Sequence, residues 1–403
     1  MHYTIYITEK FLVLLGYNTM KKARTALFCL LFVSFSLLLA ACFSPWAGDD
    51  DKGTVVLNLG AAHGRSAAMS QIQYTIYLRR IVDDIPGNRV QHGQPVSHGS
   101  TISITVAPGT YHIELEAKLN GYEYAHGSTS APVTVTAGVN ASATVQMTMT
   151  FGNHISDFLV NSTAGVTPSD PILLPWVSQL SNSNWNDLLD ALQTSGKYVS
   201  LDLSATLRGG SGELLDNNGV FDPRNSTPPN DPRKAFIVSL ILPDAAETIP
   251  DGTGGTNFPF MDFTNLLYLD TGNGITSVGS IAFYDLNLET VFFGNKLQTL
   301  GLQSFLGNKL TSVVIPPSVT SIEGSAFDSN PLKEIELGSY LSVAVAAFDS
   351  HSSVLETITI GTDVVLHENA IPHFFKTAYD AGGAGVYIRI YDDFTLTFTW
   401  VKQ

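Results

Sequence analysis

The chain has 403 residues, too many for one small domain and suitable for two or three. Charged residues make up only 14% of it, which argues against a coiled coil or a charge-rich disordered protein. The formal net charge of -15, from 36 acidic and 21 basic residues, argues against nucleic acid as a partner, because few cations are available to neutralise phosphates. The 34 glycines and 19 prolines indicate many turns and therefore many short strands.

The beginning of the chain has the pattern of a secretory signal. Lys21, Lys22 and Arg24 follow Met20 and precede an uncharged apolar run of 14 residues, too short for a membrane span. The sequence Leu39-Ala40-Ala41-Cys42 resembles the bacterial lipobox. That resemblance implies a lipoprotein signal peptide over 20–41, lipidation of Cys42 and a start-site extension over 1–19. An ordinary cleaved signal with a free Cys42 is the alternative.

The lipobox resemblance also implies a location. A lipid on Cys42 would attach the protein to a membrane, and residues 42–53, which are polar, are expected to form a tether. Phe43 stands where Asp retains such lipoproteins at the inner membrane, so the resemblance implies the outer membrane or cell surface. Removal of Cys29 with the signal leaves one thiol, which excludes a disulfide or a cysteine-based zinc site within one mature molecule.

Residues 54–150 alternate between apolar and polar positions in short runs separated by glycine and proline, which predicts an antiparallel β-sandwich. Pro108-Gly109-Thr110-Tyr111 and Gly121-Tyr122 resemble motifs of prealbumin-like and carboxypeptidase-regulatory-like sandwiches. Tyr111 is expected to pack inward and to return its hydroxyl to the backbone, as in a tyrosine corner. His112 is expected to face solvent.

Residues 151–197 are expected to form a linker and an N-terminal capping helix. Trp185, Leu188, Leu189 and Leu192 follow helical spacing after a cap at Ser183 or Asn184, and Gly196 ends the helix. The apolar stripe would cover the end of the region that follows, because the end coil of a solenoid needs a cap.

Residues 198–373 carry a repeat of about 22 residues. Leucines begin successive copies, and a phenylalanine closes each of four copies. The leucines are Leu266, Leu288, Leu310, Leu332 and Leu355, and the phenylalanines are Phe283, Phe305, Phe327 and Phe348. Apolar residues recur three and five positions after each of the last four leucines. Such a period indicates a solenoid, since one unit cannot bury its apolar positions without its neighbours.

The clearest copy, LTSVVIPPSVTSIEGSAF from Leu310 to Phe327, resembles the BspA-type leucine-rich repeat. The side chains of Asn287, Asn308 and Asn330, near the ends of copies, are expected to bond to neighbouring backbone. Residues 374–403 are expected to form a C-terminal capping hairpin. The fold class expected for the whole chain is mainly β, an Ig/prealbumin-like β-sandwich followed by a leucine-rich repeat solenoid.

The sequence contains no motif of a nucleophilic hydrolase, a phosphate-binding loop or a zinc-dependent hydrolase. His351, His367 and His373 cluster in the last copy, but no acidic or cysteine partner accompanies them in a metal-binding pattern. We therefore expect no enzymatic activity, no catalytic residue, no metal and no cofactor.

The outward positions of the stacked strands are the expected binding face. These positions are Glu289, Thr311, Ser312, Glu334, Glu336, Thr357 and Thr359. An extended polar face suits contact with another protein, and the BspA resemblance implies attachment to host matrix proteins or bacterial partners. The sequence thus predicts an adhesin-like cell-surface lipoprotein. Two alternatives are a structural or assembly protein of the envelope and a carbohydrate-binding or polysaccharide-processing protein.

Overall fold

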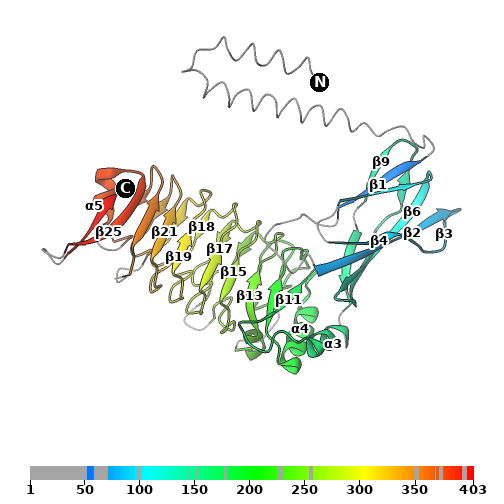
Figure 1. Ribbon diagram of the computed structural model, residues 1–403, viewed down its shortest axis with the longest axis horizontal. Helices are drawn as coiled ribbons and strands as arrows, with labels where there is room; N and C mark the ends of the chain where they lie inside the picture. Colours follow the sequence, from blue (N-terminus) through cyan, green and yellow to red (C-terminus); the bar gives the residue numbers. More distant parts are fainter. Residues whose placement is uncertain are drawn as a thin grey trace, which may run out of the picture.

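The computed structural model describes residues 52–58, 71–97, 101–143, 145–150, 153–176, 179–225, 230–253, 257–348, 354–367, 369–371, 375–392 and 397–403. The expected signal peptide, Cys42 and residues 42–51 of the expected tether lie outside these ranges. The described chain is mainly β, as predicted. It is elongated, with the N-terminal strands at one end of a long stack of short strands that runs toward the C-terminus (Figure 1).

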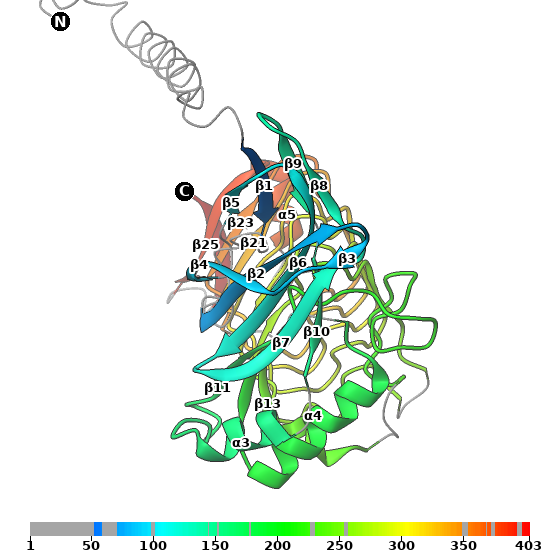
Figure 2. The same ribbon diagram turned by 90° about the vertical axis from the view of Figure 1, so that its right-hand side faces the viewer.

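The first part of the chain forms two sheets, which we call the N-terminal sheets. Their strands are β1 (Gly53–Asn58), β2 (Ile72–Val82), β3 (Ile85–Pro86), β4 (Val90–Ser97), β5 (Thr101–Val106), β6 (Gly109–Leu119), β7 (Tyr122–Thr129), β8 (Val133–Val135), β9 (Asn140–Ala143) and β10 (Val145–Met149). One sheet has the order β5-β1-β9, and the other has the order β10-β7-β6-β2-β3, with β4 and β8 paired to β2 and β6. Figure 2 shows β2, β6 and β7 as long neighbouring strands.

Alternation places one side of these strands in the core. Val55, Ile76 and Ile113 are buried, and they belong to one continuous apolar cluster. Tyr111 is buried, and its hydroxyl donates a hydrogen bond to the carbonyl oxygen of Ala107 at 2.8 Å, which confirms the prediction for this side chain. His112, on the opposite side of β6, is half-buried.

The segment between the N-terminal sheets and the repeats contains more structure than the linker predicted for it. Helix α3 (Asn153–Asn161) packs against helix α4 (Asn182–Ser195), and strand β11 (Ile172–Pro175) pairs in parallel with β12 (Val199–Asp202). Ile155, Phe158 and Leu159 give α3 a buried face at helical spacing. The parallel sheet of the solenoid therefore begins before residue 198.

Helix α4 begins earlier than predicted. The hydroxyl of Ser181, rather than that of Ser183, accepts a hydrogen bond from the backbone N–H of Asn184 at 3.2 Å. A serine two residues further on lies inside the first turn and cannot cap it. The helix ends at Gly196, whose φ of 62° is the left-handed conformation that glycine adopts without cost.

The repeats stack their parallel strands in two rows on opposite sides of a shared core. The first row, which we call the first solenoid sheet although its hydrogen-bonded ladder is divided between β17 and β19, continues from β11 and β12 through β13 (Ile237–Ile241), β15 (Tyr268–Asp270) and β17 (Thr290–Phe292). Strand β19 (Ser312–Val314) contacts β17 and begins the next ladder, which continues through β21 (Glu334–Leu337) and β23 (Thr357–Ile360). The second consists of β14 (Thr248–Ile249), β16 (Ser277–Val278), β18 (Thr299–Leu300), β20 (Ser321–Ile322), β22 (Ser342–Val343) and β24 (Val365–Leu366). A 3-10 helix, η2 (Pro232–Phe236), precedes β13.

The solenoid core repeats the same contacts from coil to coil. The rings of Phe283, Phe305, Phe327 and Phe348 form a column with successive centroids 5.0, 5.3 and 5.2 Å apart. The side chains of the leucines that begin the copies are also buried. Each copy therefore covers apolar surface of the next, so that the core continues along the stack.

Buried asparagines satisfy the backbone at the turns between copies. The Nδ2 of Asn330 donates to the carbonyl oxygens of Phe305 and Phe327, each at 2.9 Å, and its Oδ1 accepts from the N–H of Leu310. Asn308 makes the corresponding contacts one coil earlier. The predicted role of these asparagines is confirmed.

The end of the chain adds a helix and a hairpin. Helix α5 (Phe375–Gly382) was not predicted, although Phe375 and Tyr379 are buried one helical turn apart. Strand β25 (Gly385–Asp392) pairs antiparallel with β23, and β26 (Thr397–Lys402) pairs antiparallel with β25. The last strands thus extend the first solenoid sheet (Figure 1).

Candidate functional site

The solvent side of the first solenoid sheet, from β15 to β26, is one candidate site, and we call it the strand face. Five of the seven residues expected on it, Ser312, Glu334, Glu336, Thr357 and Thr359, lie on its strands with exposed or half-buried side chains. The other two, Glu289 and Thr311, are exposed but precede β17 and β19. They therefore lie at the edge of the face, because strands β17 and β19 each begin one residue later than the repeat spacing predicts.

The strand face also carries apolar groups that the sequence reasoning missed. Phe292 on β17 is 49% exposed and Val314 on β19 is 57% exposed. The ring of Tyr268 on β15 contacts that of Phe292, with centroids 5.4 Å apart. Both Phe292 and Val314 stand four positions after the leucine that begins their copy, an outward position in the template. Apolar residues at outward positions were the signal that could have found this patch.

The composition of the strand face changes along the solenoid. After the apolar patch come the carboxylates of Glu334 and Glu336 on β21, whose register aligns them with Thr357 and Thr359 on β23. Val386 pairs with Thr359 and is 39% exposed, and Val401 on β26 is 42% exposed. An elongated surface with acidic groups between two apolar areas results.

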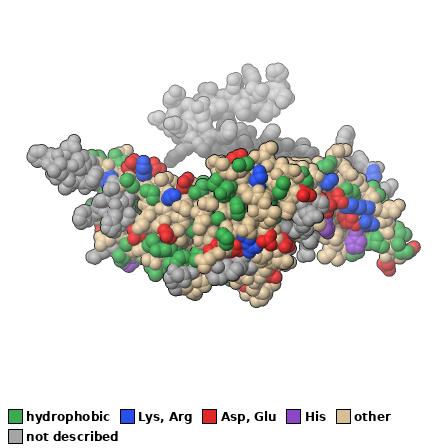
Figure 3. Space-filling view, turned by 90° about the horizontal axis from the view of Figure 1, so that it is seen from below, with side chains coloured by type: hydrophobic (Ala, Val, Ile, Leu, Met, Phe, Trp, Pro, Cys, Tyr) green, Lys and Arg blue, Asp and Glu red, His purple; other side chains and the backbone are tan. Residues whose placement is uncertain are grey.

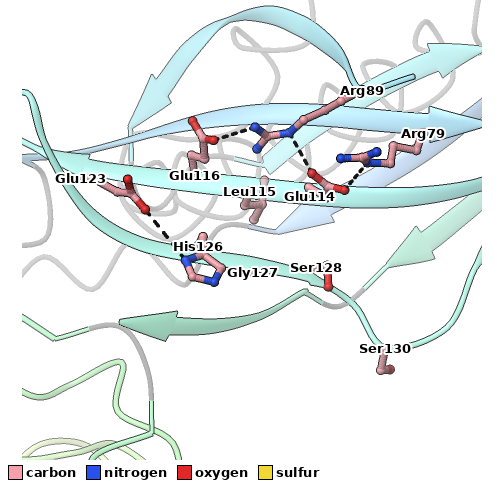
Figure 4. Close-up of a pocket in the computed structure, with 10 residues that line it drawn as sticks. All are labelled: Arg79, Arg89, Glu114, Leu115, Glu116, Glu123, His126, Gly127, Ser128 and Ser130. Carbon is pink, nitrogen blue, oxygen red and sulfur yellow. Dashed lines mark hydrogen bonds and ion pairs between the residues drawn. The ribbon is translucent and has the colours of Figure 1, made fainter. Parts of the chain in front are cut away.

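The second candidate site is a hollow of about 610 Å³ on the outer side of the larger N-terminal sheet. Ten residues line it: Arg79, Arg89, Glu114, Leu115, Glu116, Glu123, His126, Gly127, Ser128 and Ser130. Figure 4 shows the two arginines with Glu114 and Glu116 in one row, and Glu123, His126 and Ser128 on the neighbouring strand β7. In Figure 3 this end of the molecule gathers basic, acidic and histidine side chains.

Ion pairs hold the arginines of the hollow in place. Glu114 accepts from the Nε of Arg79 at 2.5 Å and from the Nε of Arg89 at 2.7 Å. The Nη1 of Arg89 also lies 2.7 Å from Glu116, and its guanidinium stacks 3.5 Å above the ring of Tyr77. Because the pairs join strands β2 and β6 with the residue before β4, they position these groups before any ligand arrives.

The same network changes the pKa values of its members. Burial would raise the pKa of Glu116, but hydrogen bonds from Arg89 and Tyr77, with the charges of Arg89 and Lys118, lower it below its usual value. The pKa of Tyr77 is raised by burial and by its hydrogen bond to Glu116. Glu116 is therefore ionised and Tyr77 neutral at neutral pH.

Neither candidate site contains an evident metal centre. Within the ranges that the structure describes, no three His, Cys, Asp or Glu side chains are grouped as a metal ion requires. His367 is exposed, while His351 and His373 lie outside those ranges. In the described part of the chain, none of the helices has both the length and the apolar character of a bilayer span.

Comparison with known families identifies the repeats. Residues 237–371 match the model of the BspA type leucine rich repeat region in six copies. No curated protein matches the chain. The match covers the solenoid from β13 onward, which contains most of the strand face, and it leaves the N-terminal sheets unassigned.

Proposed function

We propose that this protein is a cell-surface lipoprotein whose solenoid binds a protein ligand, without catalysis, through the strand face. The match of residues 237–371 to BspA-type repeats supports a binding role. The observation that carries the proposal is the exposure of Phe292 and Val314 beside the carboxylates of Glu334 and Glu336. Large apolar groups next to charges suit a protein surface, where apolar anchors supply affinity and charges supply selectivity.

The binding proposal is tested with the full chain and two matched variants. Extracellular-matrix proteins and bacterial surface proteins are immobilised, and binding is measured by surface plasmon resonance. Phe292→Ser is expected to weaken binding about tenfold, the loss typical of a central apolar contact. Leu302→Ser is the control, because Leu302 is 47% exposed but follows β18 in the second sheet. Absence of binding to every member of the panel, or equal losses in both variants, would contradict the proposal.

The surface location rests on the sequence around Cys42 and needs its own test. Cells that express the chain are labelled with palmitate, and the label is expected on the wild type and absent from Cys42→Ser. Protease added to intact cells is expected to degrade the protein. A labelled protein that resists external protease would favour a role inside the envelope instead.

A further inference from the structure

The hollow on the N-terminal sheet is separate from the strand face and has no part in the proposed protein binding. Its volume of about 610 Å³ falls in the range of small-molecule sites. Its lining mixes donors and acceptors on two rows: guanidinium and carboxylate groups on one, and hydroxyl, imidazole and carboxylate groups on the other (Figure 4). This arrangement restricts the ligands that the hollow can accept.

The side chains of the lining exclude two classes of ligand. The lining has three carboxylates, Glu114, Glu116 and Glu123, and two guanidinium groups, Arg79 and Arg89. Both arginines are paired with carboxylates, so a phosphate or carboxylate ligand would meet surplus negative charge. An apolar ligand is equally unsuited, because Leu115 is the one aliphatic side chain in the lining and it is buried.

Among uncharged ligands, one rich in hydroxyl groups fits this lining. Each carboxylate keeps acceptor sites beyond those used in the ion pairs, and each guanidinium has five N–H donors. The side chains of Glu114 and Arg89 are 22% and 32% exposed, so these remaining donors and acceptors are reachable from the hollow. Ser128 and Ser130 add hydroxyls that both donate and accept.

We propose that this hollow binds a neutral oligosaccharide. Adjacent sugar hydroxyls would bond in pairs to the fixed Arg89–Glu116 and Arg79–Glu114 groups, while Ser128 contacts the same ring from β7. The ion pairs reduce the ordering cost of binding, because they already hold the long side chains in place. Recognition here requires no charge on the ligand and no metal ion.

The test titrates the full chain with maltotriose, cellotriose and triacetylchitotriose, and with trigalacturonate as the acidic probe, by isothermal titration calorimetry. At least one neutral trisaccharide is expected to bind, and trigalacturonate is not. The double variant Arg89→Lys, Ser128→Ala keeps the charge but loses the planar guanidinium and a hydroxyl. It should weaken the binding about tenfold or more.

His112→Ala serves as the control, since His112 lies on β6 but does not line the hollow. It should bind like the wild type, and circular dichroism should give all variants the same melting temperature within a few degrees. Three results would overturn the proposal: no binding of any neutral trisaccharide, tighter binding of trigalacturonate, or equal losses in the double variant and the control. Glu336→Gln on the strand face should leave sugar binding unchanged, so failure of this proposal is distinct from failure of protein binding.

Discussion

The two regions of this molecule obtain stability from different kinds of contact. In the N-terminal sheets, β2 and β6 pair along ten residues, and Ile72 at one end meets Leu119, far along the chain. In the solenoid, strands of two to five residues pair with the equivalent strand of a neighbouring copy, as Ser321 does with Ser342. The N-terminal sheets depend on strand pairs that are distant in sequence and occur once. The solenoid depends on strand pairs that are near in sequence and recur in each copy.

This difference determines how a destabilising substitution affects the unfolding of each region. A solenoid behaves as a row of units coupled to their nearest neighbours, so a defect weakens one position and can divide the row. A sheet of long antiparallel strands unfolds as one unit, because its strands share a single core. Substitutions of matched chemistry in the two regions therefore separate the two behaviours.

The largest effect is expected from Phe305→Ala, in the middle of the aromatic column. Phe305 is fully buried between Phe283 and Phe327, and its loss should cost about 3–5 kcal/mol. Because the cavity lies between coils, we expect chemical denaturation to show two transitions where the wild-type solenoid shows one. Phe292→Ala in the same copy is the control and should cost less than about 1 kcal/mol, since Phe292 is half exposed. Similar losses in both variants would show that the column is not the basis of the stack.

The next effect concerns Lys234, which is buried beside the first copies. Its Nζ lies 3.4 Å from Asp262 and 3.3 Å from the carbonyl oxygen of Pro223. Lys234→Met should cost about 3 kcal/mol, because Asp262 keeps a buried charge without its partner. Stability should also respond to pH in a specific direction.

Burial lowers the pKa of Lys234 below its ordinary value of 10.5, against the opposing attraction of Asp262. The unfolded chain therefore binds this proton more tightly than the folded chain does. It follows that the contribution of Lys234 to the free energy of unfolding rises as the pH rises toward about 10.5. Denaturation measured from pH 7 to 10 should show a steeper rise for the wild type than for Lys234→Met. Parallel curves would mean that Lys234 titrates as it does in water.

The comparison also explains what the sequence could reveal. The solenoid was predictable because Leu288, Leu310 and Leu332 repeat at one spacing. Units that repeat in sequence stack on one another, so the spacing alone shows which residues become neighbours in space. The pairing of Arg79 with Glu114 was not predictable, since nothing in a single sequence says which strands lie side by side. The hollow depends on such pairs and was therefore missed.

The strand face falls between these cases. Its position follows from the repeat, but a set of outward residues chosen by polarity omits Phe292 and Val314, which are exposed although they are apolar. The opposite error affected helix α3, whose apolar residues Ile155 and Phe158 were assigned to a linker. Exposed apolar residues and short amphipathic helices both depend on what lies beside them in space, which composition does not specify.

A smaller effect is expected from Asn330→Ala at a turn of the solenoid. The side chain of Asn330 is buried and bonds the backbone of four residues, so its loss leaves buried polar groups unpaired at a cost of about 2 kcal/mol. These residues are Leu310, Phe305, Phe327 and Asp328. Asn287→Ala removes one hydrogen bond, to the carbonyl oxygen of Thr264, at an exposed site and should cost less than about 1 kcal/mol. Urea denaturation measures both. Equal costs would imply that water replaces the bonds of Asn330.

The smallest effect is expected in the N-terminal sheets, and it tests whether they unfold in a single transition. Tyr111→Phe keeps the buried ring and removes only the hydrogen bond from its hydroxyl to Ala107, which should cost about 1 kcal/mol. Because these sheets share one core, the loss should shift a single transition without dividing it, unlike Phe305→Ala in the solenoid. Tyr77→Phe is the matched control, since the Tyr77 hydroxyl bonds Glu116 at 3.1 Å on the open side of the sheet, where water can replace it. If Tyr77→Phe lowered the free energy of unfolding as much as Tyr111→Phe, the hydroxyl of Tyr111 would contribute no more than a surface hydrogen bond does. The corner between β5 and β6 would then depend on the packing of the ring alone.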